Sequence, residues 1–400
     1  MNEHKRRTPR LTLGLGISTC PNDTFLFHGL LTGAVEIPGI TLEIELLDVQ
    51  ELNERLLAGD FDVAKASYHL ALRMADELVA LPTGSALGFG NGPLLLARAG
   101  LHGERPGPAS LTLCPGEHTT ATLLYRLFHP RGATAEQVVF SDIMPALEGA
   151  DADFGVCIHE GRFTYADAGL SLVEDLGAVW EKATQAPLPL GGIFARRTLD
   201  EATMDAVQDG LRHSLEFAHA HRSETMATMR EHAQELSEDV VWEHVDLYVN
   251  DWTRDLGQEG RRAIAVLAER GASVGAIPEG TRLSVYEPLS ERRLFHLVPV
   301  ADGAPPQSGA LESPSLATEG FVHLSFLEQL QGTLDTHFSG VEKVLVLEID
   351  RDAVHAELRF EPSRGGALFP HLHRALDLSV DVIARVEMER EDGRLRARLG

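Results

Sequence analysis

Short apolar runs alternate with amphipathic stretches over the first half of the chain. Strands are expected at residues 11–17, 42–47, 61–66, 94–98, 111–113, 138–140 and 154–158. Strands that alternate with helical patterns predict crossover units and mainly parallel sheets. The pattern therefore indicates an α/β fold.

The pattern becomes wholly helical between residues 200 and 271. In its first helix, apolar residues recur every three or four positions, as one buried helix face requires. These residues are Val207, Leu211, Leu215 and Ala218. Two further helices are expected at 239–252 and 258–270.

A change in composition follows, because residues 271–288 mix Gly, Pro and polar residues. We expect a linker at about 276–292 and a separate small α+β domain at 293–398. In that domain, strands are expected at 294–298, 343–349, 356–360 and 380–388, with a short helix near 325–337.

Composition restricts the class of protein. Four hundred residues exceed what one core usually organises, so two or three units are expected. The net charge of -25 repels phosphate backbones and argues against nucleic-acid binding. No stretch approaches eighteen uninterrupted apolar residues, and the polar, basic start from Met1 to Arg10 lacks the apolar run of an export signal. Neither membrane insertion nor secretion is expected.

The three cysteines, Cys20, Cys114 and Cys157, are widely spaced and odd in number. They lack the paired spacing of a zinc site and are typical of reduced thiols in a cytoplasmic protein. The Gly88–Gly92 run GFGNG does not meet the GxGxxG pattern of a dinucleotide site. Neither a metal nor a cofactor is expected.

Four polar clusters fall where a predicted strand gives way to a helix: 18–25 (STCPNDTF), 65–69 (KASYH), 117–122 (EHTTAT) and 157–165 (CIHEGRFTY). Ligands of open parallel sheets bind at the carboxyl ends of strands, so these clusters should converge on one cleft. Each also exposes backbone N–H groups at a helix start, which suits a carboxylate ligand. Ordinary helix capping is the alternative for any one cluster, whereas four together favour a site.

His159 follows an apolar strand and precedes Glu160 and Gly161, so it should lie at the cleft. Its unperturbed pKa of about 6.5 suits a proton acceptor at neutral pH. From spacing alone, a structural histidine is the alternative. A metal role is disfavoured because the HE pair lacks the second histidine of an HExxH zinc helix.

Seven motifs resemble, in order, those of the 1,4-dihydroxy-6-naphthoate synthase family over residues 11–275. They are STCPNDTF at 18–25, KASYH at 65–69, GFGNGP at 88–93, TTA at 119–121, GVCIHEGRFTY at 155–165, PLPLGG at 187–192 and YVNDWTRDLG at 248–257. The resemblance implies a two-lobed fold like type II periplasmic binding proteins, whose chain crosses between lobes twice. Crossings are expected near 95–106 and 187–197, with lobe 1 at about 11–97 and 197–275 and lobe 2 at about 106–190.

This family acts in the futalosine route to menaquinone as a carbon-carbon lyase. It converts cyclic dehypoxanthine futalosine into 1,4-dihydroxy-6-naphthoate, with loss of a three-carbon ribose remnant. The resemblance implies that His159 is the proton acceptor. The expected substrate-binding residues are Ser18, Asn22, Lys65, Ala66, Ser67, Asn91, Thr119, Thr120 and Ala121. A chorismate dehydratase-like enzyme of the same pathway and a non-catalytic small-molecule binder of the same fold remain the alternatives.

Residues 294–395 are similar to a small uncharacterised bacterial domain family with an ADP-ribosyltransferase-like fold. The matching pieces are FHL at 295–297, EGFVHLS at 319–325, Gln329, RFEP at 359–362 and FPHLH at 369–373. This chain has His373 and Arg374 where that family usually has tyrosine and glycine, so no activity is carried across. Its candidate site residues are His296, His323, Ser325 and His371, which form either a small polar pocket or satisfied core positions.

Overall fold

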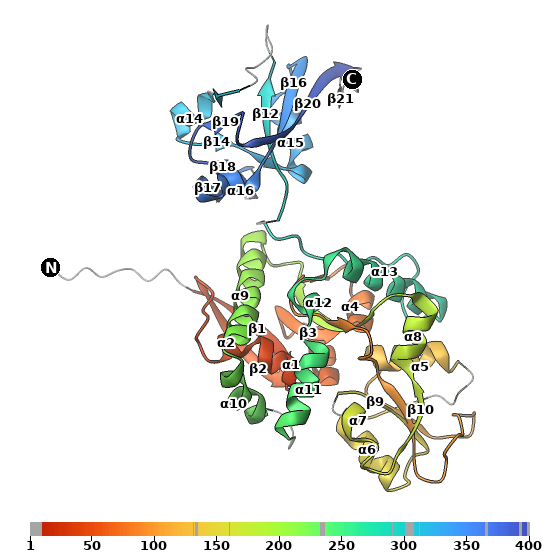
Figure 1. Cartoon of the computed structure of the whole chain (residues 1–400). Helices are drawn as coiled ribbons and strands as arrows, with labels where there is room; N and C mark the ends of the chain where they lie inside the picture. Colours follow the sequence, from red (N-terminus) through yellow and green to blue (C-terminus); the bar gives the residue numbers. More distant parts are fainter. Residues whose placement is uncertain are drawn as a thin grey trace, which may run out of the picture. The chain divides into compact units, whose positions relative to one another are not determined.

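The chain forms two compact units, Met1–Tyr286 and Glu287–Gly400, in the computed structural model (Figure 1). The structure describes residues 10–130, 132, 135–159, 161–232, 237–289, 291–300, 308–311, 313–364, 367–391 and 394–397. The basic start before Arg10 and Glu160 of the HE pair lie outside these residues. No helix within the described ranges is long and apolar enough to cross a membrane.

The first lobe of unit 1 is built on a six-stranded sheet in the order β2-β1-β3-β11-β4, with β5 paired to β11. Its strands are β1 (Leu11–Ser18), β2 (Ile40–Leu47), β3 (Val63–Ser67), β4 (Leu78–Ala80), β5 (Ala86–Gly88) and β11 (Leu188–Arg196). Its helices are α1 (Pro21–Leu26), α2 (His28–Leu31), α3 (Val49–Ala58), α4 (Tyr68–Arg73), α9 (Glu201–Ala220), α10 (Arg222–His232), α11 (Glu238–Tyr248), α12 (Asp251–Arg254) and α13 (Gly257–Ser273). In Figure 1 the green helices α9, α10 and α11 lie beside the red helices α1 and α2, with which they are in contact.

The second lobe is built on a five-stranded sheet in the order β10-β6-β9-β7-β8. Its strands are β6 (Leu94–Ala97), β7 (Thr112–Cys114), β8 (Glu136–Gln137), β9 (Phe154–Cys157) and β10 (Ser171–Asp175). Its helices are α5 (Thr120–Phe128), α6 (Phe140–Glu148), α7 (Gly161–Thr164) and α8 (Leu176–Thr184). The strand expected at 138–140 is wrong, because Phe140 begins α6. Ile143 and Leu147 of that helix are buried four residues apart, as a helix face requires.

The expectation of mainly parallel sheets is also wrong, because both sheets are mixed. β1 is parallel to β2 and β3, and β7 is parallel to β8 and β9. In contrast, β11 is antiparallel to β3, β4 and β5, and β6 is antiparallel to β9 and β10. β6 and β11 are the strands by which the chain enters one lobe from the other. No helical crossover within the same sheet therefore sets their direction.

Both crossings between the lobes come earlier in the chain than expected. β6 belongs to the second sheet and all four of its residues are buried, so 95–106 is not the first crossing. The chain crosses between β5 and β6, at residues 89–93, and returns before β11 begins at Leu188. Because β6 and β11 are apolar strands that pair within a sheet, neither of them is a connecting segment between the lobes.

The expected linker at 276–292 is largely packed. Ile277 belongs to a core cluster of unit 1 and is 3% exposed. The segment then runs beside β4, where the N–H of Ala80 donates to Ser284 (2.9 Å) and the N–H of Tyr286 donates to Ala80 (2.8 Å). Leu289, three residues further on, already belongs to the core of unit 2. The boundary between the units therefore falls directly after Tyr286.

Unit 2 is a small strand-rich domain. Its sheets have the orders β15-β12-β16-β20-β21, β14-β18-β17 and β13-β19. The strands are β12 (Leu294–Pro299), β13 (Ala310–Leu311), β14 (Val322–His323), β15 (Ser325–Phe326), β16 (Lys343–Ile349), β17 (Leu358–Pro362), β18 (Leu368–Leu372), β19 (Leu376–Asp377), β20 (Val382–Glu391) and β21 (Arg394–Ala397). The α-helices are α14 (Pro314–Glu319), α15 (Leu330–His337) and α16 (Arg351–Val354). The helix expected at 325–337 begins only at Leu330, because Ser325 and Phe326 pair with β12 as a strand.

Candidate active site

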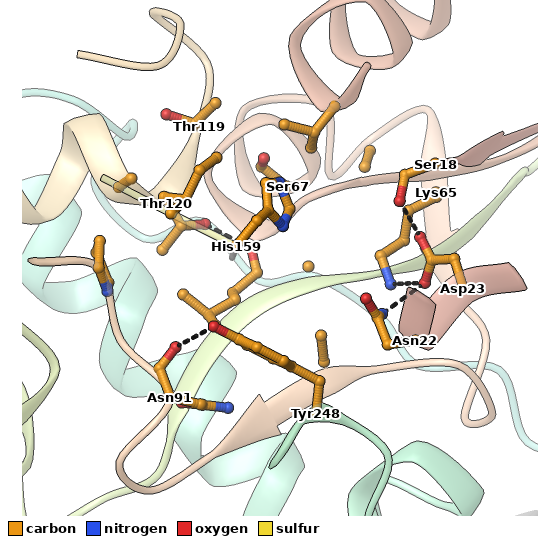
Figure 2. Close-up of a pocket in the computed structure, with 18 residues that line it drawn as sticks. Ser18, Asn22, Asp23, Lys65, Ser67, Asn91, Thr119, Thr120, His159 and Tyr248 are labelled. Atoms are coloured by element: carbon orange, nitrogen blue, oxygen red, sulfur yellow. Dashed lines mark hydrogen bonds and ion pairs between the residues drawn. The ribbon is translucent and has the colours of Figure 1, made fainter. Parts of the chain in front are cut away.

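A cleft of about 650 Å³ lies in unit 1, and residues of both lobes line it. Figure 2 shows these side chains, which come mainly from strand ends and helix starts. The lining residues are Ser18, Asn22, Asp23, Val49, Lys65, Ala66, Ser67, Ala86, Asn91, Pro93, Thr119, Thr120, Ala121, Ile158, His159, Leu190, Gly191 and Tyr248. All ten residues that the sequence analysis assigns to this site, His159 and the nine substrate-binding candidates, are among them.

The convergence follows from the sheet topology. β1 and β3 run parallel, so Ser18 and Ser67 end at the same edge of the first sheet. Helices α1 and α4 begin directly after these ends, and Thr119 caps α5 in the second lobe. Polar residues at these strand ends and helix starts thereby line one cleft.

The start of α5 can hold an anion. The Thr119 hydroxyl is the helix cap, because it accepts from the N–H of Thr122 (3.2 Å). Thr120 and Ala121, in the first turn, carry backbone N–H groups that have no acceptor within the helix. The Thr120 hydroxyl is already used, since it donates to the carbonyl of Leu190 (2.7 Å). A carboxylate would therefore rest on backbone N–H groups of α5, while the Thr120 side chain holds this helix start against β11.

Ser67 faces this helix start with its hydroxyl proton available. Asn53 of α3, which is fully buried, donates from Nδ2 to the Ser67 hydroxyl oxygen (3.2 Å). The Asn53 Oδ1 accepts from the N–H of Ser67 (2.9 Å). Because the Ser67 oxygen serves as acceptor in this pair, its own O–H can donate to a ligand. The sequence analysis did not identify Asn53, and only its contact with Ser67 reveals it.

Asn91 lies at the first crossing between the lobes. Its side-chain amide, oriented to satisfy both partners, bonds the N–H and the carbonyl of Gly88 (both 3.2 Å). The hydroxyl of Tyr248 donates to the Asn91 carbonyl (3.2 Å), as Figure 2 shows. Asn91 thus holds the crossing in shape where it borders the cleft. Tyr248, within the YVNDWTRDLG motif, is a lining residue that the sequence analysis did not single out.

His159 stands at the end of β9 in an uncommon backbone conformation. Its φ is 56°, in the left-handed region that side chains with a Cβ rarely adopt. Strained residues of this kind cluster at functional sites. The Cys20 sulfur lies 3.3 Å from Nδ1, and the ring of Phe140 packs edge-on at 4.9 Å between centroids. The backbone turn and these neighbours direct the imidazole into the cleft.

Asp23 and Lys65 form a buried ion pair in the cleft lining. Lys65 Nζ lies 2.6 Å from Asp23 Oδ1, and the two side chains are 7% and 3% exposed. Asp23 belongs to the STCPNDTF motif, but nothing in the sequence indicated that it pairs with Lys65. Behind this pair lies His244 of α11, which is completely buried and which the sequence analysis also missed.

The candidate residues of unit 2 are only partly brought together. His323 and His371 are paired across β14 and β18, with their rings edge-to-face at 5.1 Å. His371 donates from Nδ1 to Glu361 (2.7 Å), and burial is the main cause that lowers its pKa. His296 bonds the carbonyl of His323 (2.8 Å) from the neighbouring sheet.

The fourth candidate of unit 2 has a different setting. Ser325 is buried, and its hydroxyl bonds that of Thr333 in α15 (3.2 Å). Across the part of the chain that the structure describes, no group of three or more His, Cys, Asp or Glu side chains is arranged to hold a metal ion.

Comparisons with known proteins divide the chain at the same place as the structure. Residues 13–273 match a family described as menaquinone biosynthesis, and residues 301–386 match one described as a protein of unknown function (DUF952). The chain is 44% identical to 1,4-dihydroxy-6-naphthoate synthase of Thermus thermophilus over 274 residues, covering 68% of this chain and 99% of that protein. It is 40% identical over 276 residues to the protein of the same name from Streptomyces coelicolor, covering 67% and 95%.

A solved structure supports the expected fold. The alkanesulfonate-binding protein SsuA from Xanthomonas axonopodis pv. citri superimposes with a TM-score of 0.54 at 14% identity, over 69% of this chain and 98% of that one. At this identity the likeness concerns the fold alone. The two-lobed periplasmic-binding-protein-like fold expected from the sequence is thereby confirmed.

Proposed function

The chain belongs to the menaquinone biosynthesis family, and on that premise we propose that unit 1 is a 1,4-dihydroxy-6-naphthoate synthase. As such it converts cyclic dehypoxanthine futalosine into 1,4-dihydroxy-6-naphthoate, as a carbon-carbon lyase that uses His159 as the base.

One observation carries the proposal: a single cleft holds a histidine, an anion site and a buried ion pair. The product is a carboxylate, and the start of α5 together with the Ser67 hydroxyl offers donors for one. Held there, the substrate lies with its carboxylate at one wall of the cleft and its ribose-derived part toward His159. Figure 2 supports this arrangement, because His159 lies between Thr119 and Thr120 on one side and Asp23 and Lys65 on the other.

In this proposal His159 removes a proton from the substrate. A positioned general base contributes about a hundredfold to ten-thousandfold in rate. The enclosing lobes exclude water from the enolate-like intermediate that proton removal creates. Lys65, with its positive charge in the same cleft, offers a hydrogen-bond donor to the oxygen on which negative charge develops.

The test is direct conversion by the purified protein. Cyclic dehypoxanthine futalosine is supplied, and 1,4-dihydroxy-6-naphthoate is detected by mass spectrometry. His159→Ala should lower turnover by at least a hundredfold while binding of the product is largely retained. His213→Ala, at an exposed histidine of α9, is the matched control and should turn over normally.

Other results would redirect the proposal. Turnover of His159→Ala close to that of the unchanged protein would remove His159 as the base. Dehydration of chorismate in place of naphthoate formation would favour the related dehydratase activity. Tight binding of the naphthoate without any turnover would favour a binding protein.

The proposal includes a cytoplasmic location, as the sequence analysis expects. It is supported by the cysteines, since none of the three forms a disulfide in the part of the chain that the structure describes. The assigned activity belongs to unit 1, to which every residue of the cleft belongs.

A further inference from the structure

Every oxygen of the buried Asp23 carboxylate has a hydrogen-bond partner. Lys65 Nζ (2.6 Å) and Asn22 Nδ2 (2.9 Å) both reach Oδ1, and the Ser18 hydroxyl donates to Oδ2 (2.8 Å). Figure 2 shows these contacts at one side of the cleft. Buried ion pairs are stable only when such additional hydrogen bonds satisfy the remaining polar atoms. Asn22 is therefore part of what holds the pair in place.

Asn22 can take only one orientation in this network. An ionised carboxylate only accepts, so the amide of Asn22 must present Nδ2 to Asp23 and turn Oδ1 away. The atom that Oδ1 meets is Nε2 of His244, at 3.0 Å. The two residues are 222 positions apart in the sequence, and His244 comes from α11. Helix α11, which is distant from the ion pair in the sequence, thus helps to hold the pair through Asn22.

The contact also defines the protonation of His244. Because Asn22 Oδ1 accepts, Nε2 of His244 carries the proton and Nδ1 is left as an acceptor. Burial above all, and then His159 and Lys65, lower the pKa of His244 well below its ordinary value. The ring therefore remains neutral and supplies a donor without adding charge to the cleft.

Packing alone does not account for an imidazole at this position. His244 is 0% exposed, and its Nδ1 is buried without a hydrogen-bond partner among the residues that the structure describes. An apolar side chain would fill the same space and leave no nitrogen unpaired, and buried polar atoms of this kind call for an explanation. The hydrogen bond from Nε2 to Asn22 supplies that explanation.

We propose that His244 is a positioning residue of the lyase reaction, which acts through Asn22 to hold the Asp23–Lys65 pair against the substrate. A lysine ammonium has three N–H donors. Asp23 takes one, and the carbonyl of Gly84 (3.4 Å) takes a second. The third is left for the substrate oxygen that gains negative charge when His159 removes a proton. His244 itself touches no substrate, and no proton passes through it.

This inference rests on the proposed function and deepens it by adding a second, indirect determinant of rate. It also predicts a separation of effects. The carboxylate of the ligand rests on α5 and Ser67, whereas His244 governs the Asp23–Lys65 pair. Loss of His244 should therefore reduce kcat and leave binding of the naphthoate product almost unchanged.

The test compares His244→Leu with His244→Gln in the full chain. Glutamine can place an amide N–H close to the position of Nε2, whereas leucine offers volume without a donor. His244→Leu should lower kcat at least tenfold and change the Kd of 1,4-dihydroxy-6-naphthoate less than twofold. His244→Gln should recover kcat to within about threefold of the unchanged protein, a difference of about 0.6 kcal/mol in the barrier. Val245→Ala, one residue on and equally buried, is the control for packing and should keep its kcat per folded molecule.

Equal loss in the leucine and glutamine variants, or a loss that Val245→Ala reproduces, would show that the ring serves packing alone. A measurement independent of activity separates this inference from the proposed function. In protein with ¹⁵N-labelled histidine, Nε2 of His244 should be protonated and Nδ1 should not, and Asn22→Ala should shift the Nε2 signal. A proton on Nδ1 would overturn the inference even in an active enzyme. Absence of naphthoate formation by the unchanged protein, with the expected tautomer present, would refute the proposed function alone.

Discussion

Truncation after Tyr286 should leave unit 1 folded and active, whereas truncation after Glu279 should markedly lower its stability. The segment between these points belongs to unit 1 in space. This segment pairs with β4 through Ala80, whose N–H and carbonyl both form hydrogen bonds with the backbone of the segment. Val285 forms a parallel bridge with Ala80. If the segment were the linker that its composition predicts, truncation anywhere within it would leave unit 1 folded.

The side chain of Tyr286 indicates how much unfolding free energy this segment contributes. Its side chain is 5% exposed and packs in a core cluster beneath the first sheet. Its hydroxyl donates to Asp205 Oδ1 (3.2 Å) and to the carbonyl of Glu201 (3.3 Å). Replacing a buried aromatic ring by alanine costs about 3–5 kcal/mol, out of a stability that is typically about 5–15 kcal/mol. Tyr286→Phe removes the hydroxyl alone and should cost about 0.5–1.5 kcal/mol.

The assay is urea unfolding followed by tryptophan fluorescence. All three tryptophans, Trp180, Trp242 and Trp252, lie in unit 1, so the signal reports that unit. Tyr286→Ala in the full chain and the truncation after Glu279 should unfold at clearly lower urea than the truncation after Tyr286. Arg282→Ala, an exposed position on the same segment, is the control and should leave the midpoint unchanged.

Equal midpoints for the two truncations would refute the assignment of this segment to unit 1. Turnover per folded molecule adds a second criterion. A loss of more than about tenfold after truncation at Tyr286, or about 1.4 kcal/mol in the barrier, would mean that unit 2 contributes to catalysis.

Two further predictions concern the anion site and its support. Ser67→Ala should weaken binding of the naphthoate product by about 1.5–3 kcal/mol, which is the value of a hydrogen bond to a charged group. Thr120→Val should mainly lower stability, because it leaves the Leu190 carbonyl unpaired. Calorimetric titration decides this, and weaker binding by Thr120→Val than by Ser67→Ala would contradict it. The pKa of His69 is lowered to about 4, chiefly by burial, so the unfolded chain binds more protons below about pH 6.5 and stability should fall as the pH drops from there toward 4. His69→Asn can keep the bond to the Thr119 carbonyl. Between pH 7 and pH 5, its free energy of unfolding should fall by about 2 kcal/mol less than that of the unchanged protein. Equal falls for the two proteins in urea unfolding would refute the role of His69.

Much of the cleft could be predicted because its residues lie at strand ends. Ser18 and Ser67 were placed together by a general property of sheets, namely that the ends of parallel strands share an edge. The motif sequence also pointed to His159. Its left-handed backbone conformation, which turns the imidazole into the cleft, follows from no sequence pattern and was seen only in the structure.

The order of apolar and polar residues by itself predicted many of the strands and helices and placed the change from one unit to the next between residues 276 and 292. The polar clusters at strand ends also predicted side chains that line the cleft. Local patterns can do this because burial and capping depend on near neighbours. The tertiary structure decided the antiparallel directions of β6 and β11, the packing of Tyr286 and the chain of contacts from His244 through Asn22 to Asp23 and Lys65. Periodicity indicates that a residue is buried but not which distant atom it meets. The hydrogen bond between His244 and Asn22, 222 positions apart, is formed only when α11 packs against α1 within the first lobe.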